Sequence, residues 1–170
     1  MRGDNPAVPN YELWVAAEQA DLIWNALLQS GAAEVHEQTL ETFRILCGIP
    51  KVGQDTREKT LPQETGQDRA LNFNKGCYIG QEIVERIRAR GAVHRVLVGF
   101  ELEGAAPVAG TKIVSEGKEV GEMTSIIAEP LKGKWLGLGY LRREFLATDK
   151  TLSAGDAEMK AVPLPFSGLF

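Results

Sequence analysis

Near the middle of the 170-residue chain stands the sequence Lys75-Gly76-Cys77-Tyr78-Ile79-Gly80-Gln81-Glu82. Beyond it, Ile83 and Ile87 continue the spacing of four residues that begins at Ile79, which predicts a helix with these side chains on one face. The residues up to Gly80 then lie at the start of this helix. Backbone N–H groups point outward there and the helix dipole is positive, so the segment is suited to hold a negative charge.

Two interpretations stay open for the cysteine in this segment. At a helix start and beside Lys75, the Cys77 thiol would lose its proton more easily than a free cysteine does, and it would then serve as a redox or transfer thiol. The alternative is a small buried hydrophobic residue, which is a common role of a lone cysteine.

Residues 75–82 resemble the K-G-C-Y-x-G-Q-E signature of YgfZ-type folate-binding proteins, which are relatives of the glycine-cleavage T-protein, an aminomethyltransferase. Two upstream segments resemble the same family in the same order. Residues 44–50 are similar to its R-I-x-x-G-I-P segment, and residues 61–64 to its L-P-Q-E segment. The resemblance implies a tetrahydrofolate-binding protein that supports the assembly or repair of iron–sulfur clusters and, through them, tRNA modification.

The resemblance also implies which residues hold the cofactor. Relatives place a glutamate of the L-P-Q-E segment against the pterin ring, so Glu64 is expected to bind tetrahydrofolate. Lys75, Tyr78, Gln81 and Glu82 are expected to complete the site around the Cys77 thiol. A carboxylate suits the pterin edge because it accepts two parallel N–H donors. Without the resemblance, Glu64 would be interpreted as a solvated loop glutamate.

Composition narrows the possible partners. The net charge of −4 gives no global reason to expect direct nucleic-acid binding. Two cysteines, Cys47 and Cys77, fit a reducing cytosol and cannot form a metal site alone, so no metal ligand is expected. No apolar run approaches the roughly 20 residues that span a bilayer, so we expect a cytoplasmic protein without a membrane partner.

Four arginines fall close together after the signature: Arg86, Arg88, Arg90 and Arg95. Such a cluster would hold a phosphate, an acidic folate tail or an RNA backbone. The alternative is a solvated helix end, where arginines favour the negative pole of the helix dipole.

The first half of the chain predicts a partial α+β domain over residues 1–91, which the resemblance identifies as ferredoxin-like and folate-binding. The alternating residues 11–15 predict a strand, and a second short strand is expected around residues 34–36. Helices are expected over 17–29 and from Thr39, the second with Leu40, Phe43, Leu46 and Cys47 facing inward. Residues 51–71 read as a long loop, which in a compact chain is usually functional or disordered.

The pattern changes to short strands in the second half. Glycine punctuation and the absence of a helical period predict a small antiparallel β-barrel over residues 92–170. Glu116-Gly117 is expected to form a hairpin turn. The expected strands cover residues 95–102, 111–115, 119–127, 135–141 and 157–162.

Compared with the family pattern, the chain lacks an N-terminal segment and the catalytic aspartate of T-proteins. We therefore expect a truncated gene product, an expressed fragment or half of a split protein, with an incomplete folate pocket. Exposed apolar surface would then favour a homodimer or pairing with a second chain.

Three functions remain open. The leading one is an accessory folate-binding protein with iron–sulfur proteins or their assembly machinery as partners, rather than a classical enzyme. One thiolate does not hold a cluster that needs four cysteine ligands, so Cys77 would act with a partner or only transiently. The second is a folate-dependent aminomethyltransferase, disfavoured because T-proteins typically carry K-G-x-F-I-G without the cysteine. The third is a non-catalytic interaction module without a ligand.

Overall fold

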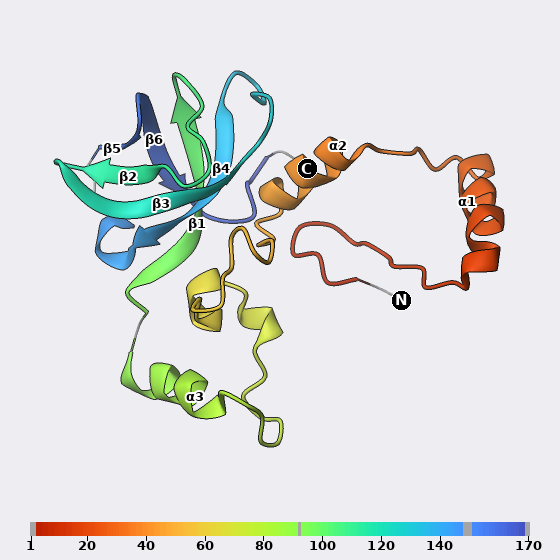
Figure 1. The fold of residues 1–170 in the computed structure, drawn as a ribbon, viewed down its shortest axis with the longest axis horizontal. Helices are drawn as coiled ribbons and strands as arrows, with labels where there is room; N and C mark the ends of the chain where they lie inside the picture. Colours follow the sequence, from red (N-terminus) through yellow and green to blue (C-terminus); the bar gives the residue numbers. More distant parts are fainter. Residues whose placement is uncertain (1–2, 92, 148–150, 169–170) are drawn as a thin grey trace.

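The computed structural model describes residues 3–91, 93–147 and 151–168. Its C-terminal part is a closed antiparallel barrel with the strand order β1-β4-β3-β2-β5-β6 (Figure 1). This confirms the predicted α+β class with a C-terminal barrel. Residue 92, at the predicted domain boundary, lies outside the described residues, and the division into two domains stays a prediction. The strands are β1 Arg95–Glu103, β2 Lys112–Ser115, β3 Lys118–Ile126, β4 Trp135–Arg142, β5 Leu152–Ala154 and β6 Ala157–Val162.

The turn between β2 and β3 is the predicted hairpin. Glu116 and Gly117 have φ angles of 51° and 77°. A two-residue turn of this kind needs positive φ at both central positions, because only then does its twist match that of the two strands. The hairpin sets the register in which Ser115 lies opposite Lys118.

Glycines allow β3 and β4 to approach closely. A Cβ atom at Gly139 would lie 2.5 Å from the Glu122 carbonyl oxygen, and one at Gly137 would lie 2.5 Å from that of Ser125. Side chains at these positions would force the strands apart. The register between the two strands also shifts at Met123/Ser125, where a bulge bends the sheet.

The apolar core has two parts. One fills the barrel interior and includes Phe100, Leu102, Ile113 and Met123, all fully buried. The other joins helix α2, Glu37–Leu46, to the outer face of the barrel. It contains Ile45, Leu46, Leu97, Leu138, Tyr140 and Phe166. Cys47, directly after α2, is 1% exposed, which confirms its predicted place in the core.

The N-terminal arm packs differently from its prediction. The predicted helix is found as a 3₁₀ turn, Ala17–Gln19, followed by α1, Ala20–Gln29. No residue of α1 is buried, and Figure 1 shows the helix held away from the barrel. Leu22 on its apolar face is 71% exposed, and Leu40 of α2, expected to face inward, is 54% exposed. Pairing of this surface with another chain stays a prediction.

The two strands predicted in this arm were wrong. Residues 12–16 and 32–36 belong to no strand, and Tyr11 forms only a single β-bridge. An extended segment becomes a strand only when a neighbour pairs with its backbone, and the described part of the chain offers these segments no such neighbour.

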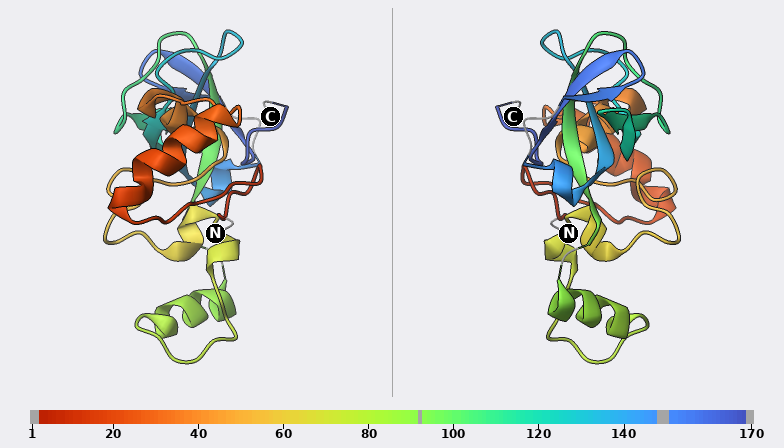
Figure 2. Two further views of the ribbon diagram at one scale, coloured as in Figure 1. Left: turned by 90° about the vertical axis from the view of Figure 1, so that its right-hand side faces the viewer. Right: turned by 90° about the vertical axis from the view of Figure 1, so that its left-hand side faces the viewer.

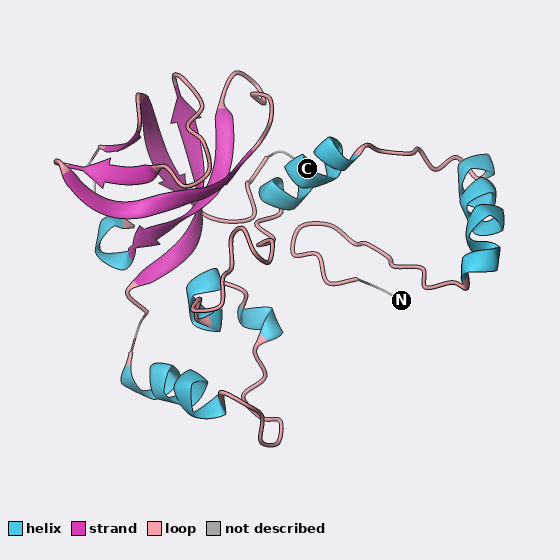
Figure 3. Cartoon of the chain, viewed as in Figure 1, coloured by secondary structure: helices cyan, strands magenta, loops and turns pink. Residues whose placement is uncertain are grey.

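Helix α3, Gln81–Arg90, is the helix predicted after the signature sequence. It lies at the opposite end of the molecule from the barrel, below two 3₁₀ turns, Pro62–Thr65 and Asp68–Ala70 (Figures 2 and 3). Two residues of the predicted isoleucine face are exposed, Ile79 at 104% and Ile83 at 46%, whereas Ile87 is half-buried and Val84 is buried. None of the helices in the described ranges has the length and apolar character needed to cross a membrane.

A buried carboxylate fastens the loop after α2 to the barrel. The Asp55 side chain is fully buried and accepts four hydrogen bonds. Oδ2 accepts from Arg44 Nη1 at 2.7 Å and from the Lys51 backbone N–H at 2.8 Å. Oδ1 accepts from the hydroxyl groups of Thr124 at 2.5 Å and Ser125 at 2.7 Å. Helix α2, the loop that follows it and β3 therefore all donate hydrogen bonds to the Asp55 carboxylate.

We expect Asp55→Asn to lower the free energy of unfolding by about 3 kcal/mol, because it leaves Arg44 without its buried counter-charge. Urea unfolding followed by circular dichroism measures the change. Glu122→Gln is the matched control, since it breaks surface ion pairs with Arg57 and Lys112 and should change stability little. Equal losses in both variants would show that Asp55 does not fasten the loop.

Candidate functional site: the Glu64–Arg95 junction

Glu64 lies where the 3₁₀ turn Pro62–Thr65 meets the start of β1. Its side chain is only 10% exposed, and Oε2 accepts hydrogen bonds from Arg95 Nε and Nη2, both at 3.1 Å. Gly66, with a φ of 67°, ends the turn and lets the chain leave it. Glu64 is therefore not a solvated loop glutamate.

Arg95 connects this carboxylate to a buried tyrosine. Its guanidinium carbon lies 4.6 Å from the centroid of the Tyr140 ring. Strand pairing explains the contact, because Tyr140 lies opposite Leu97, two residues along β1 from Arg95. Burial raises the pKa of Tyr140 to about 12, although the charge of Arg95 opposes this rise. The phenol is therefore neutral and able to donate a hydrogen bond at physiological pH.

Glu64 and Arg95 line a pocket of about 760 Å³. This volume falls within the range of small-molecule sites, roughly 300–1,000 Å³. Three arginines, Arg95, Arg142 and Arg143, line it together with His94 and Glu144. The pocket thus combines one buried carboxylate, suited to N–H donors, with guanidinium groups suited to an anionic group.

The signature residues gather at a different place, before α3. Gly80 has a φ of 88° and directly precedes the helix, as predicted. Lys75 Nζ lies 4.5 Å from the centroid of the Tyr78 ring, and the Tyr78 backbone N–H donates to Gln81 Oε1 at 3.4 Å. The Cys77 side chain is exposed, which excludes the buried interpretation.

The predicted site residues therefore form two groups. Glu64 lies against the barrel, whereas Lys75, Cys77, Tyr78, Gln81 and Glu82 surround the start of α3. A hydrogen bond joins the two regions: Gln63 Nε2 donates to the Val84 carbonyl oxygen at 3.1 Å. Their roles in binding a cofactor stay predictions.

The predicted arginine cluster is divided as well. Arg95 lies at the start of β1, where it pairs with Glu64. Arg88 lies on α3, 4.5 Å from the centroid of the Phe73 ring and 3.6 Å from Glu85. Sequence reasoning missed Tyr140, Arg142 and Arg143. The signal was present in β4, where the alternation of a strand puts Tyr140 and Arg142 on the same face.

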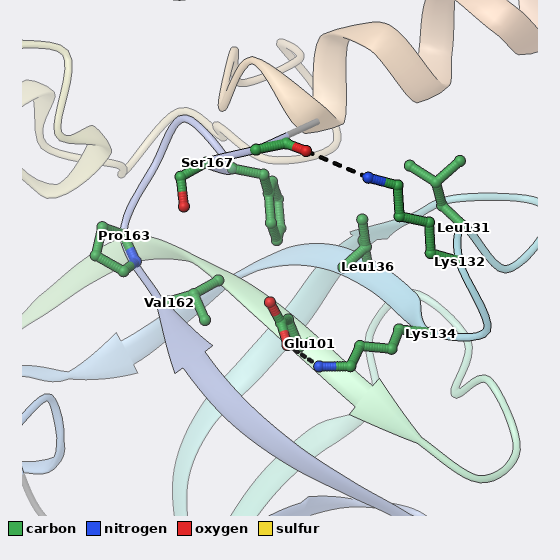
Figure 4. Close-up of a pocket in the computed structure, with 10 residues that line it drawn as sticks. Glu101, Leu131, Lys132, Lys134, Leu136, Val162, Pro163 and Ser167 are labelled. Atoms are coloured by element: carbon green, nitrogen blue, oxygen red, sulfur yellow. Dashed lines mark hydrogen bonds and ion pairs between the residues drawn. The ribbon is translucent and has the colours of Figure 1, made fainter. Parts of the chain in front are cut away.

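A second pocket, of about 350 Å³, lies on another side of the barrel and contains no predicted site residue (Figure 4). Its two lysines are both engaged. Lys134 is paired with Glu101 at 2.5 Å, and Lys132 Nζ donates to the Gly168 carbonyl oxygen at 3.3 Å. Leu136 and Val162 supply apolar walls, so the pocket offers little unpaired polar chemistry.

The barrel has recognisable relatives. Residues 95–166 match the glycine cleavage T-protein C-terminal barrel domain. The barrel is therefore similar in sequence to that domain. The likeness is to the glycine-cleavage T-protein superfamily, and it does not single out the YgfZ-type branch.

Proteins similar to this chain include several aminomethyltransferases. That of Rubrobacter xylanophilus is 31% identical over 92% of this chain and 42% of its own length. That of Rippkaea orientalis is 33% identical over 78% of this chain and 36% of its own length. The crystal structure of glycine cleavage system aminomethyltransferase T from Bartonella henselae has the same fold, with a TM-score of 0.70 and 21% identity over 86% of this chain and 43% of that one. The chain thus spans less than half the length of these relatives.

We expect the two cysteines to differ sharply in alkylation. Iodoacetamide should modify the native chain once, at the exposed Cys77, because Cys47 is buried beside Asn5 and burial raises the pKa of the Cys47 thiol. Intact-mass spectrometry counts the added groups over time. A second group should appear only in denaturant, and native Cys77→Ser should take up none. Modification of both cysteines at one rate would contradict the structure.

Proposed function

We propose that this chain takes part in tetrahydrofolate-dependent aminomethyl transfer, as the barrel-bearing part of an aminomethyltransferase-type protein. The alignment of 92% of the chain with an aminomethyltransferase is the observation that carries the proposal. The comparisons favour this function over the iron–sulfur role expected first from the signature sequence. The activity of the full-length relatives is part of the proposal, because the chain spans less than half of them.

The Glu64 pocket has the chemistry that folate recognition requires. Tetrahydrofolate carries N–H donors on its pterin ring and an acidic tail. In our proposal Glu64 accepts the pterin donors, while Arg142 and Arg143 attract the tail. Lys75, Tyr78, Gln81 and Glu82 remain proposed contributors from the start of α3.

One feature of the pocket constrains how the pterin is bound. Paired acceptance of two N–H donors uses both carboxylate oxygens, but Glu64 Oε2 already accepts two hydrogen bonds from Arg95. Arg95 therefore has to release or share this oxygen when the pterin arrives. The cation–π contact with the Tyr140 ring would still hold the Arg95 guanidinium after it releases Glu64.

A YgfZ-type role in iron–sulfur cluster assembly is the second candidate. The exposure of Cys77 within the K-G-C-Y-I-G-Q-E sequence supports it, because a transfer thiol has to be accessible. Iron–sulfur proteins or their assembly machinery would be the partners. Cys77→Ser separates the two functions: aminomethyl transfer from a glycine-derived donor should survive the substitution, whereas a thiol-dependent transfer should be lost.

Calorimetric titration of tetrahydrofolate into the reduced chain tests the proposal. We expect saturable binding that Glu64→Gln weakens by about ten- to a hundredfold, because the variant loses a charge-assisted hydrogen-bond acceptor. Glu101→Gln is the control, since Glu101 is likewise paired with a basic residue but lies in the other pocket. It should bind as the natural chain does.

Absence of binding by the folded chain, or equal binding by Glu64→Gln, would overturn the assignment of this pocket. Thermal unfolding of each variant has to accompany the titration. Glu64→Gln also removes the ion pair with Arg95, and a loss of folded protein would otherwise imitate a loss of binding.

A further inference from the structure

The buried Tyr140 hydroxyl has no hydrogen-bond partner of ordinary geometry among the described residues. Thr60 is near enough to oppose the rise in the Tyr140 pKa, but this contact does not satisfy the hydroxyl. The whole residue is only 4% exposed. The other buried side-chain atoms left unpaired in the described ranges are the amide oxygens of Gln63 and Gln67, whose amino groups are both engaged. A buried hydroxyl is costly unless something pairs with it, so a partner from outside the chain is expected.

A cavity of about 280 Å³ opens beside this hydroxyl. It lies on the outer face of the barrel, under the loop of residues 54–60, with Tyr140 and Thr124 on the barrel side. One water occupies about 30 Å³ of liquid volume, so the space holds several waters or one small molecule. Arg57, Lys59, Thr60 and Arg95 line it from other sides.

Two of the three carboxylates that line this cavity, Asp55 and Glu122, are already paired. Asp55 accepts its four hydrogen bonds from the protein, as described above. Glu122 is bound by Arg57 Nη2 at 3.1 Å and by Lys112 Nζ at 2.9 Å. These groups therefore create no demand for a cation in the cavity.

Donors remain on the guanidinium groups. A guanidinium has five N–H groups. Arg57 uses Nη2 for Glu122, and Arg95 uses Nε and Nη2 for Glu64, which leaves the Nη1 donors of both. Glu58 and Lys59 at the same cavity are adjacent and opposite in charge. The hydrogen-bond donors still available in the cavity therefore include the neutral Tyr140 phenol and the remaining N–H groups of two guanidinium groups.

We propose that this cavity binds a small molecule through a carboxylate group. One carboxylate oxygen accepts the hydrogen bond of the Tyr140 hydroxyl, and the guanidinium groups of Arg57 and Arg95 supply charge-assisted donors. A singly charged carboxylate fits better than a doubly charged phosphate, because Asp55 and Glu122 stand on the same wall. This inference does not rest on the proposed function, although Arg95 lines both pockets.

Titration of acetate, with [ζ-¹³C]tyrosine-labelled protein observed by NMR, tests the proposal. The chain has three tyrosines, Tyr11, Tyr78 and Tyr140, so Tyr140→Phe assigns the resonance directly. We expect acetate to shift the Tyr140 signal saturably and to leave Tyr11 and Tyr78 unchanged. Sodium chloride at equal ionic strength should leave all three signals in place, and inorganic phosphate should bind more weakly than acetate.

Two variants separate binding from folding. Tyr140→Phe removes an unpaired hydroxyl and should fold normally, but acetate should stabilise it less, with affinity from thermal-shift titration reduced about tenfold. Arg57→Gln, at the exposed edge, should weaken binding while the Tyr140 signal still reports it. A linear shift without saturation, an equal response to chloride, or unchanged affinity in Tyr140→Phe would overturn the proposal and assign the cavity to solvent.

Discussion

The structure depends on the buried negative charge of Asp55. Asp55 takes both of its oxygens out of water, and this is tolerable only because each oxygen receives two hydrogen bonds. The donors come from helix α2, from the loop and from β3, so these segments must be placed correctly together. The same network holds the loop that covers the Tyr140 cavity. The half-exposed Glu41 extends it beside Arg44, and the hydrogen bond from Arg44 lowers the pKa of Glu41.

Arg95 joins the two sites that the structure brings together. On one side it neutralises Glu64, and on the other it lies against the ring of Tyr140. A guanidinium group can do both because its edge carries the N–H donors while its flat face is free to stack. Any ligand that competes for Glu64 therefore also changes the charge next to Tyr140. The two pockets are chemically distinct but share one cation.

The barrel was largely predictable from the sequence. Strand-like segments separated by glycines located five of the six strands, and Glu116-Gly117 located a turn, because both signals arise from residues close together in the chain. Strand β5, only three residues long, was too short to show a period. The strands of the N-terminal arm failed as predictions because pairing depends on a neighbour that local sequence does not reveal. Glu64 was identified only through family resemblance, and its partner Arg95, 31 residues away, followed only from the fold.

Helix α1 has a thermodynamic consequence. The heat capacity of unfolding arises mainly from apolar surface that is newly exposed to water, at about 12–15 cal/mol/K per residue in ordinary globular proteins. α1 buries no residue in the folded chain, and most of its neighbours in the arm are exposed as well. Melting of this arm therefore adds little to the heat capacity of unfolding. The heat capacity of unfolding therefore comes mostly from the barrel and α2. We expect its value per residue, averaged over the whole chain, to fall below the ordinary range.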